Sequence, residues 1–439
     1  MSASWDENAT SFQKLNTQRA FWALIAFIAA QRFLLPGVSE FICLIPFAAA
    51  LRHFGCNEKL CNSLLILALF WSVDHAVVEN GETPAVVRYL IYATTTLTLA
   101  LNSSITKMGF LGTAIAFVLY LGTTLAHVNE NLSGMQMWRD IQILVLGGIL
   151  FSLRKRQPYE LDFGLLFYAT IGYLFSECVN YLAFAEVWYG HYMSYASTKY
   201  LIAIPSLMAL FVGRPLVAWT LVGLTILALV GYTSRSLFLG YLISLIAILT
   251  LLPIQNGRIK RFLVVGCIVP AVLVSANLDL ETILQSRKAL NMFYLLQVHG
   301  ANSLEILDPV RFASSAIFFE LTLFDLLFGR GLGSGLYDSN GLLGFVEINQ
   351  SAFSAQELNS NYFFNFHDVW VDLGLRFGLL PLTLFVVWLV RLRPTSNCPQ
   401  TAIWILAFIG VFSAFFGVSG LISIAILLRV LQSYRAAHV

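Results

Sequence analysis

The sequence predicts an all-α polytopic membrane protein with about fourteen transmembrane helices and one large, partly helical periplasmic loop. Hydrophobic residues make up 58% of the 439 positions and charged residues 11%, whereas soluble domains carry about 25% charged residues. Apolar segments close to membrane-spanning length follow one another along the chain. One polar stretch, 277–366, interrupts them and is far longer than an ordinary connection. These observations favour a helical bundle in a lipid bilayer with one folded extramembrane loop.

The hydrophobic segments are expected at 20–35, 38–54, 60–74, 86–101, 108–127, 139–153, 161–184, 199–213, 216–232, 236–253, 260–276, 369–391, 402–418 and 419–434. The last two could instead form one long helix, but the expected turn Gly417-Val418-Ser419-Gly420 favours two. Residues 1–19 lack a strongly basic start, and no small-residue cleavage site follows, so we expect a retained first helix rather than a signal peptide. The chain thus divides into an N-terminal bundle of about eleven spans (1–276), the loop (277–366) and C-terminal transmembrane helices (367–439), within one integral membrane domain.

Basic residues indicate the orientation, because short cytoplasmic loops carry an excess of Lys and Arg. With the N-terminus inside, the clusters Arg154-Lys155-Arg156 and Arg258 to Arg261 both face the cytoplasm. Both termini are then cytoplasmic, and the long loop faces outward, into the periplasm of a diderm bacterium. The net charge of +2 is too small to indicate a nucleic-acid partner. None of the six cysteines falls in the long loop, so no disulfide framework is implied.

Two outward-facing arginines are candidates for phosphate binding, because a guanidinium offers a planar fork of donors. Arg235 lies in Thr233-Ser234-Arg235-Ser236, at the outer end of a helical hairpin. An arginine there that only reaches the lipid headgroups is about equally expected. Arg311 follows Asp308-Pro309 at the start of an amphipathic loop helix. Its simpler interpretation is a surface salt bridge with a nearby acidic residue, Asp308 or Glu305.

The loop offers two further candidate substrate contacts. Phe328 to Gly335 is glycine-rich, and Arg330, Gly331 and Gly333 could surround phosphate oxygens with N–H groups. A tight turn at the membrane surface is the simpler interpretation. Arg287 and Lys288 are adjacent and less specific, and a solvated surface explains them equally well.

His367 precedes the twelfth span and is the candidate general base, since histidine titrates near neutral pH. Asp368, Asp372 and Arg376 follow at four-residue intervals and share one helix face. Ionisable groups within a span face the bundle interior or a wet cavity and suggest a functional site. The alternative for Asp372 and Arg376 is a structural ion pair that locks the helix.

No metal ion or other cofactor is expected. Asp279 and Glu281 are the one acidic pair that could imitate a metal site, and a solvated turn accounts for them better. The sequence has no group of His, Cys and acidic residues with metal-ligand spacing.

The chain resembles the bacterial O-antigen ligase/polymerase superfamily, which includes Wzy-type polysaccharide polymerases and WaaL-type O-antigen ligases. The family pattern is a Ser-Arg at an outer hairpin, a large periplasmic loop with an Arg, a glycine-rich turn, and a His-Asn-x-x-Leu that opens a helix running to Gly-x-x-Gly. The matching residues, in the same order, are Ser234-Arg235, Arg311, Phe328 to Gly335, and His367 to Gly378. They cover roughly residues 230–390.

The chain departs from the family pattern at three positions. Asp368 replaces the Asn after the histidine, Val371 replaces the Leu, and Pro381 replaces the second Gly. A carboxylate beside His367 would raise the basicity of its ring or accept its N–H, so the role of the family's Asn amide does not carry over.

The resemblance implies a GT-C-like architecture in the bacterial inner membrane and an inverting, metal-independent glycosyl transfer. An undecaprenyl-diphosphate-linked oligosaccharide is the donor, and an acceptor sugar hydroxyl attacks its anomeric carbon. Arg235 and Arg311 would stabilise the diphosphate, and His367 would accept the proton of the hydroxyl. The lipid bilayer is a further partner, and a flippase and a chain-length regulator of the same pathway fit this scheme.

The first interpretation is a repeat-unit polymerase for an O-antigen or exopolysaccharide. The alternative within the family is an O-antigen ligase, which transfers the glycan to lipid A–core. An alternative of another class is a polytopic transporter or a lipid-linked sugar flippase. A transporter predicts paired halves and helices broken at mid-membrane, whereas the charges here gather on one side.

Overall fold

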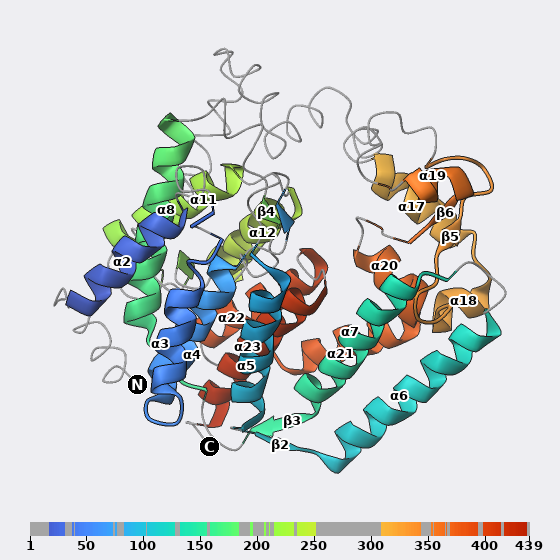
Figure 1. The fold of residues 1–439 in the computed structure, drawn as a ribbon, viewed down its shortest axis with the longest axis horizontal. Helices are drawn as coiled ribbons and strands as arrows, with labels where there is room; N and C mark the ends of the chain where they lie inside the picture. The colour runs from blue at the N-terminus through green and yellow to red at the C-terminus, as the bar shows by residue number, and fades with distance from the viewer. Residues whose placement is uncertain are drawn as a thin grey trace.

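The structure, a computed structural model, describes residues 17–30, 37–38, 40–72, 75–76, 83–101, 103–127, 132–155, 159–183, 194–195, 206–207, 210, 215–231, 235–251, 309–343, 353, 355–364, 366, 369–393, 398–413 and 417–436. Across these residues the chain is mostly helical, as predicted, with three short antiparallel strand pairs (Figure 1).

The helices before the long loop are α2 (Thr17–Ala30), α3 (Leu44–His53), α4 (Glu58–Trp71), α5 (Ala85–Leu101), α6 (Lys107–Ala126), α7 (Gly134–Ser152), α8 (Phe163–Ala183), α11 (Pro215–Gly231) and α12 (Arg235–Leu251). The later ones are α17 (Pro309–Phe319), α18 (Leu323–Phe328), α19 (Ala355–Ser360), α20 (Val369–Phe377), α21 (Leu379–Arg391), α22 (Cys398–Ser413) and α23 (Gly417–Ala436). Strand β1 (His75–Ala76) pairs with β4 (Ser194–Tyr195), β2 (Ser103–Ile105) with β3 (Leu153–Lys155), and β5 (Leu336–Tyr337) with β6 (Tyr362–Phe363).

Each predicted hydrophobic segment within the described residues overlaps a helix, and α22 and α23 are separate helices. Gly417 to Gly420, predicted as the turn between them, instead form the first turn of α23. Segment 260–276 and nearly all of 199–213 lie outside those residues. Segment 369–391 differs from the prediction of one span, because it forms two helices, α20 and α21, bent by 116°. In the described part of the chain, one helix, Gly109–Ala126 of α6, is long and apolar enough to cross a membrane. The bent α20–α21 pair would be a second if it is counted as a single span.

Side chains that cap helix N-termini explain where several helices begin. Asn57 accepts the Leu60 N–H at the start of α4 (3.1 Å), and Thr106 accepts the Gly109 N–H at the start of α6 (3.1 Å). Thr322 does the same for Asp325 in α18 (3.2 Å). Each bond satisfies one backbone N–H that has no partner within the helix.

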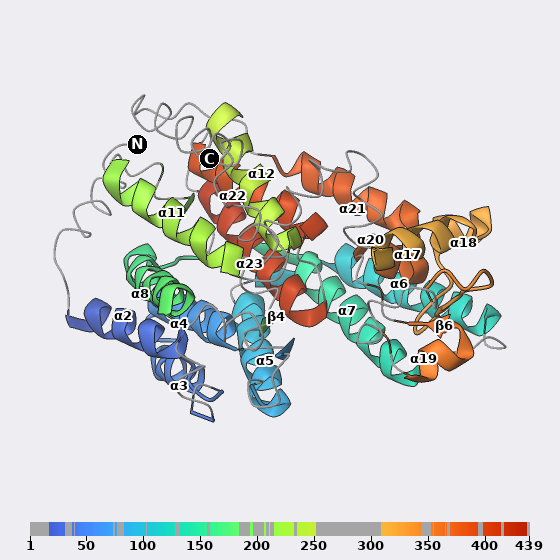
Figure 2. The same cartoon turned by 90° about the horizontal axis from the view of Figure 1, so that it is seen from above.

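The larger apolar core joins α2, α3, α4, α5, α8, α11, α12, α22 and α23. Helix α2 packs along α8, α3 along α4, and α12 along α22. In Figures 1 and 2 these helices form one end and the centre of the molecule. Trp71, Ile91 and Leu174 are among its almost fully buried side chains.

A second, smaller core lies at the opposite end, where α17, α18, α19, β5 and β6 gather beside α20 (Figure 1). Val310 and Ile317 of α17 belong to it, together with Phe363 of β6 and Leu375 of α20. Helix α17 confirms the amphipathic helix predicted to start at Pro309, with Val310, Ser314 and Ile317 buried at helical spacing. This core brings the start of the C-terminal helices against the end of the long loop.

Candidate functional site around the glycine-rich turn

The glycine-rich turn after α18 lies against α20 through backbone contacts. The Arg330 N–H donates to the Leu375 carbonyl (2.7 Å), and the Gly331 N–H donates to the Arg376 carbonyl (3.3 Å). These two carbonyls belong to the last turn of α20, where helical acceptors have no partner of their own. The turn therefore completes the C-terminal end of α20.

The same turn also contacts α6 and α7. The Leu332 N–H donates to Thr124 Oγ1 (2.7 Å), and the Gly333 N–H donates to Asp140 Oδ2 (2.8 Å). Protein acceptors thus already bind the N–H groups of Gly331 and Gly333, and the phosphate-binding interpretation needs those N–H groups to be available. The hydrogen bonds of the two glycines fit the tight-turn interpretation better.

Gly329 and Gly378 allow the two chain segments to meet. Both have positive φ, 78° and 82°. A Cβ on Gly329 would lie 2.4 Å from the Arg376 carbonyl oxygen, and one on Gly378 would lie 2.2 Å from the Leu327 carbonyl oxygen. Because backbone atoms fill both spaces, only glycine fits. Gly378 lies between α20 and α21, so this close approach explains the bend between them.

Asp372 and Arg376 form the ion pair that their spacing predicts, and the pair is buried. Arg376 Nη1 lies 2.5 Å from Asp372 Oδ1, and the two side chains are 1% and 4% exposed. Arg376 Nη1 also donates to the Asp372 carbonyl (2.8 Å), and Nη2 donates to the Phe364 carbonyl (2.6 Å). This arrangement favours the structural alternative for the two side chains over direct substrate binding.

Two charged residues of α7 complete the pair, and sequence reasoning missed both. Asp140 Oδ2 lies 2.8 Å from Arg376 Nε, and Arg139 Nη2 donates to Asp372 Oδ2 (3.2 Å). We call Arg139, Asp140, Asp372 and Arg376 the charge cluster. Its formal charges sum to zero, which lowers the free-energy cost of burying the four side chains. A signal was present in the sequence, because Arg139 and Asp140 are adjacent charges at the start of an apolar segment.

Asp325 joins the turn to the end of α6. Its carboxylate lies 3.6 Å from Arg330 Nε and 3.4 Å from His127 Nε2. Arg330, a predicted substrate contact, is thus paired with an acid of the preceding helix and is 14% exposed. His127, just after the end of α6, therefore also belongs to this group.

The predicted catalytic residues are described to different extents. Arg311 is on α17, which packs against α20, and its side chain is partly buried. Arg235 is the first residue of α12. The structure describes its backbone but not its side chain. His367, Asp368, Arg287 and Lys288 lie outside the described residues. That Arg235, Arg311 and His367 converge on one outward-facing cavity therefore stays a prediction.

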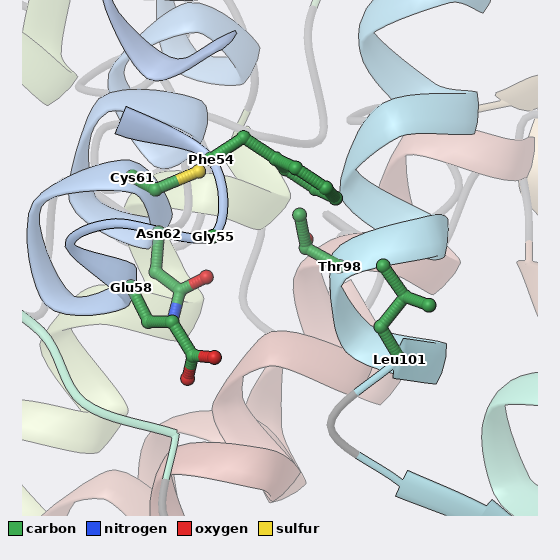
Figure 3. A pocket seen from close by; sticks show the side chains of 7 residues that line it. All are labelled: Phe54, Gly55, Glu58, Cys61, Asn62, Thr98 and Leu101. Atoms are coloured by element: carbon green, nitrogen blue, oxygen red, sulfur yellow. The ribbon is translucent and has the colours of Figure 1, made fainter. Parts of the chain in front are cut away.

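One pocket lies far from this site, between the α3–α4 turn and the end of α5 (Figure 3). Phe54, Cys61, Thr98 and Leu101 line it, and its one charged lining side chain is the carboxylate of Glu58. A carboxylate without a cation does not suit a phosphate ligand. Within the described ranges, no group of three or more His, Cys, Asp or Glu could hold a metal ion; Asp279 and Glu281 lie outside those ranges.

The site therefore consists of a glycine-rich turn held between α7 and α20 by backbone bonds and the charge cluster, with Arg311 on the neighbouring α17. No protein-family model matches the chain, and a search of the curated proteins finds no match either.

Proposed function

We propose that the chain is a repeat-unit polymerase of a surface or secreted polysaccharide, embedded in the bacterial inner membrane. The observation that carries the proposal is the assembly of three segments that the family resemblance singles out. The Arg311 helix packs against α20, and the glycine-rich turn bonds to the end of α20, which opens just after His367. Segments spread over about seventy positions thus meet at one place.

Contacts between segments that the basic-residue pattern assigns to the same side support the predicted topology. Strands β2 and β3 pair, and both are expected at the cytoplasmic face. Strands β1 and β4 pair, and both are expected outside. The Ser133 N–H, at the outer end of α7, donates to the Gly333 carbonyl in the loop (3.1 Å).

The surface of α6 supports contact with lipid. This helix exposes large apolar side chains, among them Phe110 (69%) and Val118 (67%). Exposed apolar surface of this extent is unfavourable in water and marks a membrane or protein contact.

In the proposed reaction, an acceptor sugar hydroxyl attacks the anomeric carbon of the undecaprenyl-diphosphate-linked glycan. The new C–O bond forms as the bond to the diphosphate oxygen breaks, with inversion, and the electron pair leaves with the lipid diphosphate. His367 takes the hydroxyl proton. Arg235 and Arg311 stabilise the charge that develops on the diphosphate, without a metal ion.

The test is polysaccharide chain length in a strain that lacks the gene. We expect His367→Ala to lower polymerisation about 10²–10⁴-fold, the usual contribution of general-base assistance. His53→Ala is the matched control, because His53 ends α3 on the expected cytoplasmic side. Protein levels in the membrane are measured alongside. Wild-type polymer from His367→Ala at equal protein level would refute the mechanism. Polymer that is still made in the strain lacking the gene, but is not attached to lipid A–core, would instead indicate a ligase.

The absence of a metal requirement is tested in purified protein. Transfer from the lipid-linked donor should continue in EDTA. Complete loss that Mg²⁺ or Mn²⁺ restores would contradict the arginine-based mechanism and return attention to Asp279 and Glu281.

A further inference from the structure

Arg376 connects the two stretches of backbone that flank His367 in the sequence. Its Nη2 donates to the carbonyl of Phe364, three positions before His367 (2.6 Å). Its own backbone and that of Asp372 belong to α20, which begins two positions after His367. One guanidinium thus ties the approach to His367 to the helix that follows it.

Asp140 attaches this guanidinium to the rest of the site. Its Oδ2 atom contacts Arg376 Nε (2.8 Å) and also accepts the Gly333 N–H (2.8 Å). A carboxylate on α7 therefore sets where both Arg376 and the glycine-rich turn lie. The contact to Arg376 Nε is an ion pair rather than a well-aligned hydrogen bond, so charge is the main attraction.

The burial of Arg376 argues against a direct part in substrate binding. Its side chain is 1% exposed and contacts two carboxylates and two backbone carbonyls. A substrate could reach it only after these buried contacts were broken, which is costly for a charge in a low-dielectric interior. A role that acts through the neighbouring backbone fits all of its contacts.

We propose that Arg376 and Asp140 are positioning residues, which hold the backbone on both sides of His367 in register with the glycine-rich turn. The proposal rests on the proposed function only in that His367 is the general base there. Positioning matters because a shift of about 1 Å in a reacting group can cost roughly 10²-fold in rate.

The test compares Asp140→Asn with Asp338→Asn as the matched control. Both aspartates are 1% exposed, and Asp338 accepts the N–H groups of Leu342 (3.0 Å) and Leu343 (2.6 Å) within its own turn. Each variant loses a buried carboxylate charge, but only Asp140 reaches Arg376. Thermal unfolding curves of the purified variants identify a temperature at which all of them are folded. Then kcat and KM are measured at that temperature.

We expect Asp140→Asn to lower kcat about 10–100-fold, with KM for the lipid-linked donor nearly unchanged. Asp338→Asn should keep kcat close to that of the wild type. Arg376→Lys should retain more kcat than Arg376→Met, because lysine keeps the positive charge. It should still fall below the wild type, because lysine lacks the planar set of guanidinium donors. Folded Asp140→Asn protein with the kcat of Asp338→Asn would overturn the proposal and leave the proposed function intact.

A distance measurement makes the test independent of activity. Spin-labelled amino acids are incorporated at Trp138 of α7 and Asn359 of α19, both exposed. A shift of Phe364 should also move helix α19, because Glu357 Oε1 of that helix accepts the Phe364 N–H (2.9 Å). The distance distribution should broaden in Asp140→Asn and not in Asp338→Asn, and equal distributions would refute the positioning role of Asp140. If the wild type shows no transferase activity, the proposed function fails, while this measurement still decides whether Asp140 holds these segments in place.

Discussion

The apolar core around α4 and the charge cluster around Arg376 are both deeply buried, but side chains of opposite character fill them. Trp71 and Arg376 are the largest of the fully buried side chains that the structure describes. Trp71 belongs to the large apolar core and lies beside Trp22, with ring centroids 6.3 Å apart, whereas Arg376 lies between two aspartates. Apolar contacts have no direction, so many neighbours can satisfy Trp71. Arg376 needs acceptors at fixed positions, so its surroundings are far more specific.

This difference indicates where substitutions will be tolerated. Cores accept hydrophobic exchanges of similar volume at modest cost. A buried charge left without its partner has no such alternative. We therefore expect the elements around the glycine-rich turn to be more sensitive to conservative changes than the larger core.

The largest effect is expected from Arg376→Ala. It leaves Asp140 and Asp372 buried with one arginine fewer, which should lower the free energy of unfolding by about 3–5 kcal/mol. A denaturant titration of the purified protein in detergent measures this. A cost as small as that of a single methylene in the large core would remove the contrast between the two regions.

Asp140→Asn should have the next largest effect, about 1–3 kcal/mol, because Arg376 loses one of the two carboxylates that compensate its burial. The amide oxygen can still accept the Gly333 N–H, but it no longer carries a charge opposite Arg376. The same titration is used. A variant as stable as the wild type would show that Asp372 alone balances Arg376.

Ile91→Val tests the large core. Ile91 is fully buried in α5, and removing one methylene typically costs about 0.5–1.5 kcal/mol. Comparing this value with that of Asp140→Asn in one titration series sharpens the contrast. A greater loss for Ile91→Val than for Asp140→Asn would reverse the order of the two regions.

The smallest effect on stability is expected from Arg139→Gln, at most about 1 kcal/mol. Its side chain is 31% exposed, so solvent screens its bond to Asp372. Unfolding curves for this variant and for Arg376→Ala in parallel separate the edge of the charge cluster from its centre. Similar losses for both would mean that the four charges act as one unit.

Much of the helical structure follows from local sequence. Apolar runs predict where helices lie, and caps such as Asn57 and Thr106 act on the same local scale, between neighbours in the chain. The i,i+4 spacing likewise indicated that Asp372 and Arg376 share a helix face, and their ion pair was the alternative to a substrate-binding role.

The partners that these residues find elsewhere could not be predicted in the same way. Asp140 and Gly333 are 193 positions apart, and Arg139 and Asp372 are 233 apart. The bend at Gly378 also depends on a distant segment, since it accommodates the backbone at Leu327. Helical periodicity predicts which face of a helix is buried, but not which distant segment of the chain packs against that face. The packing of α7, α20 and the glycine-rich turn therefore decided that charges from separate segments form one cluster.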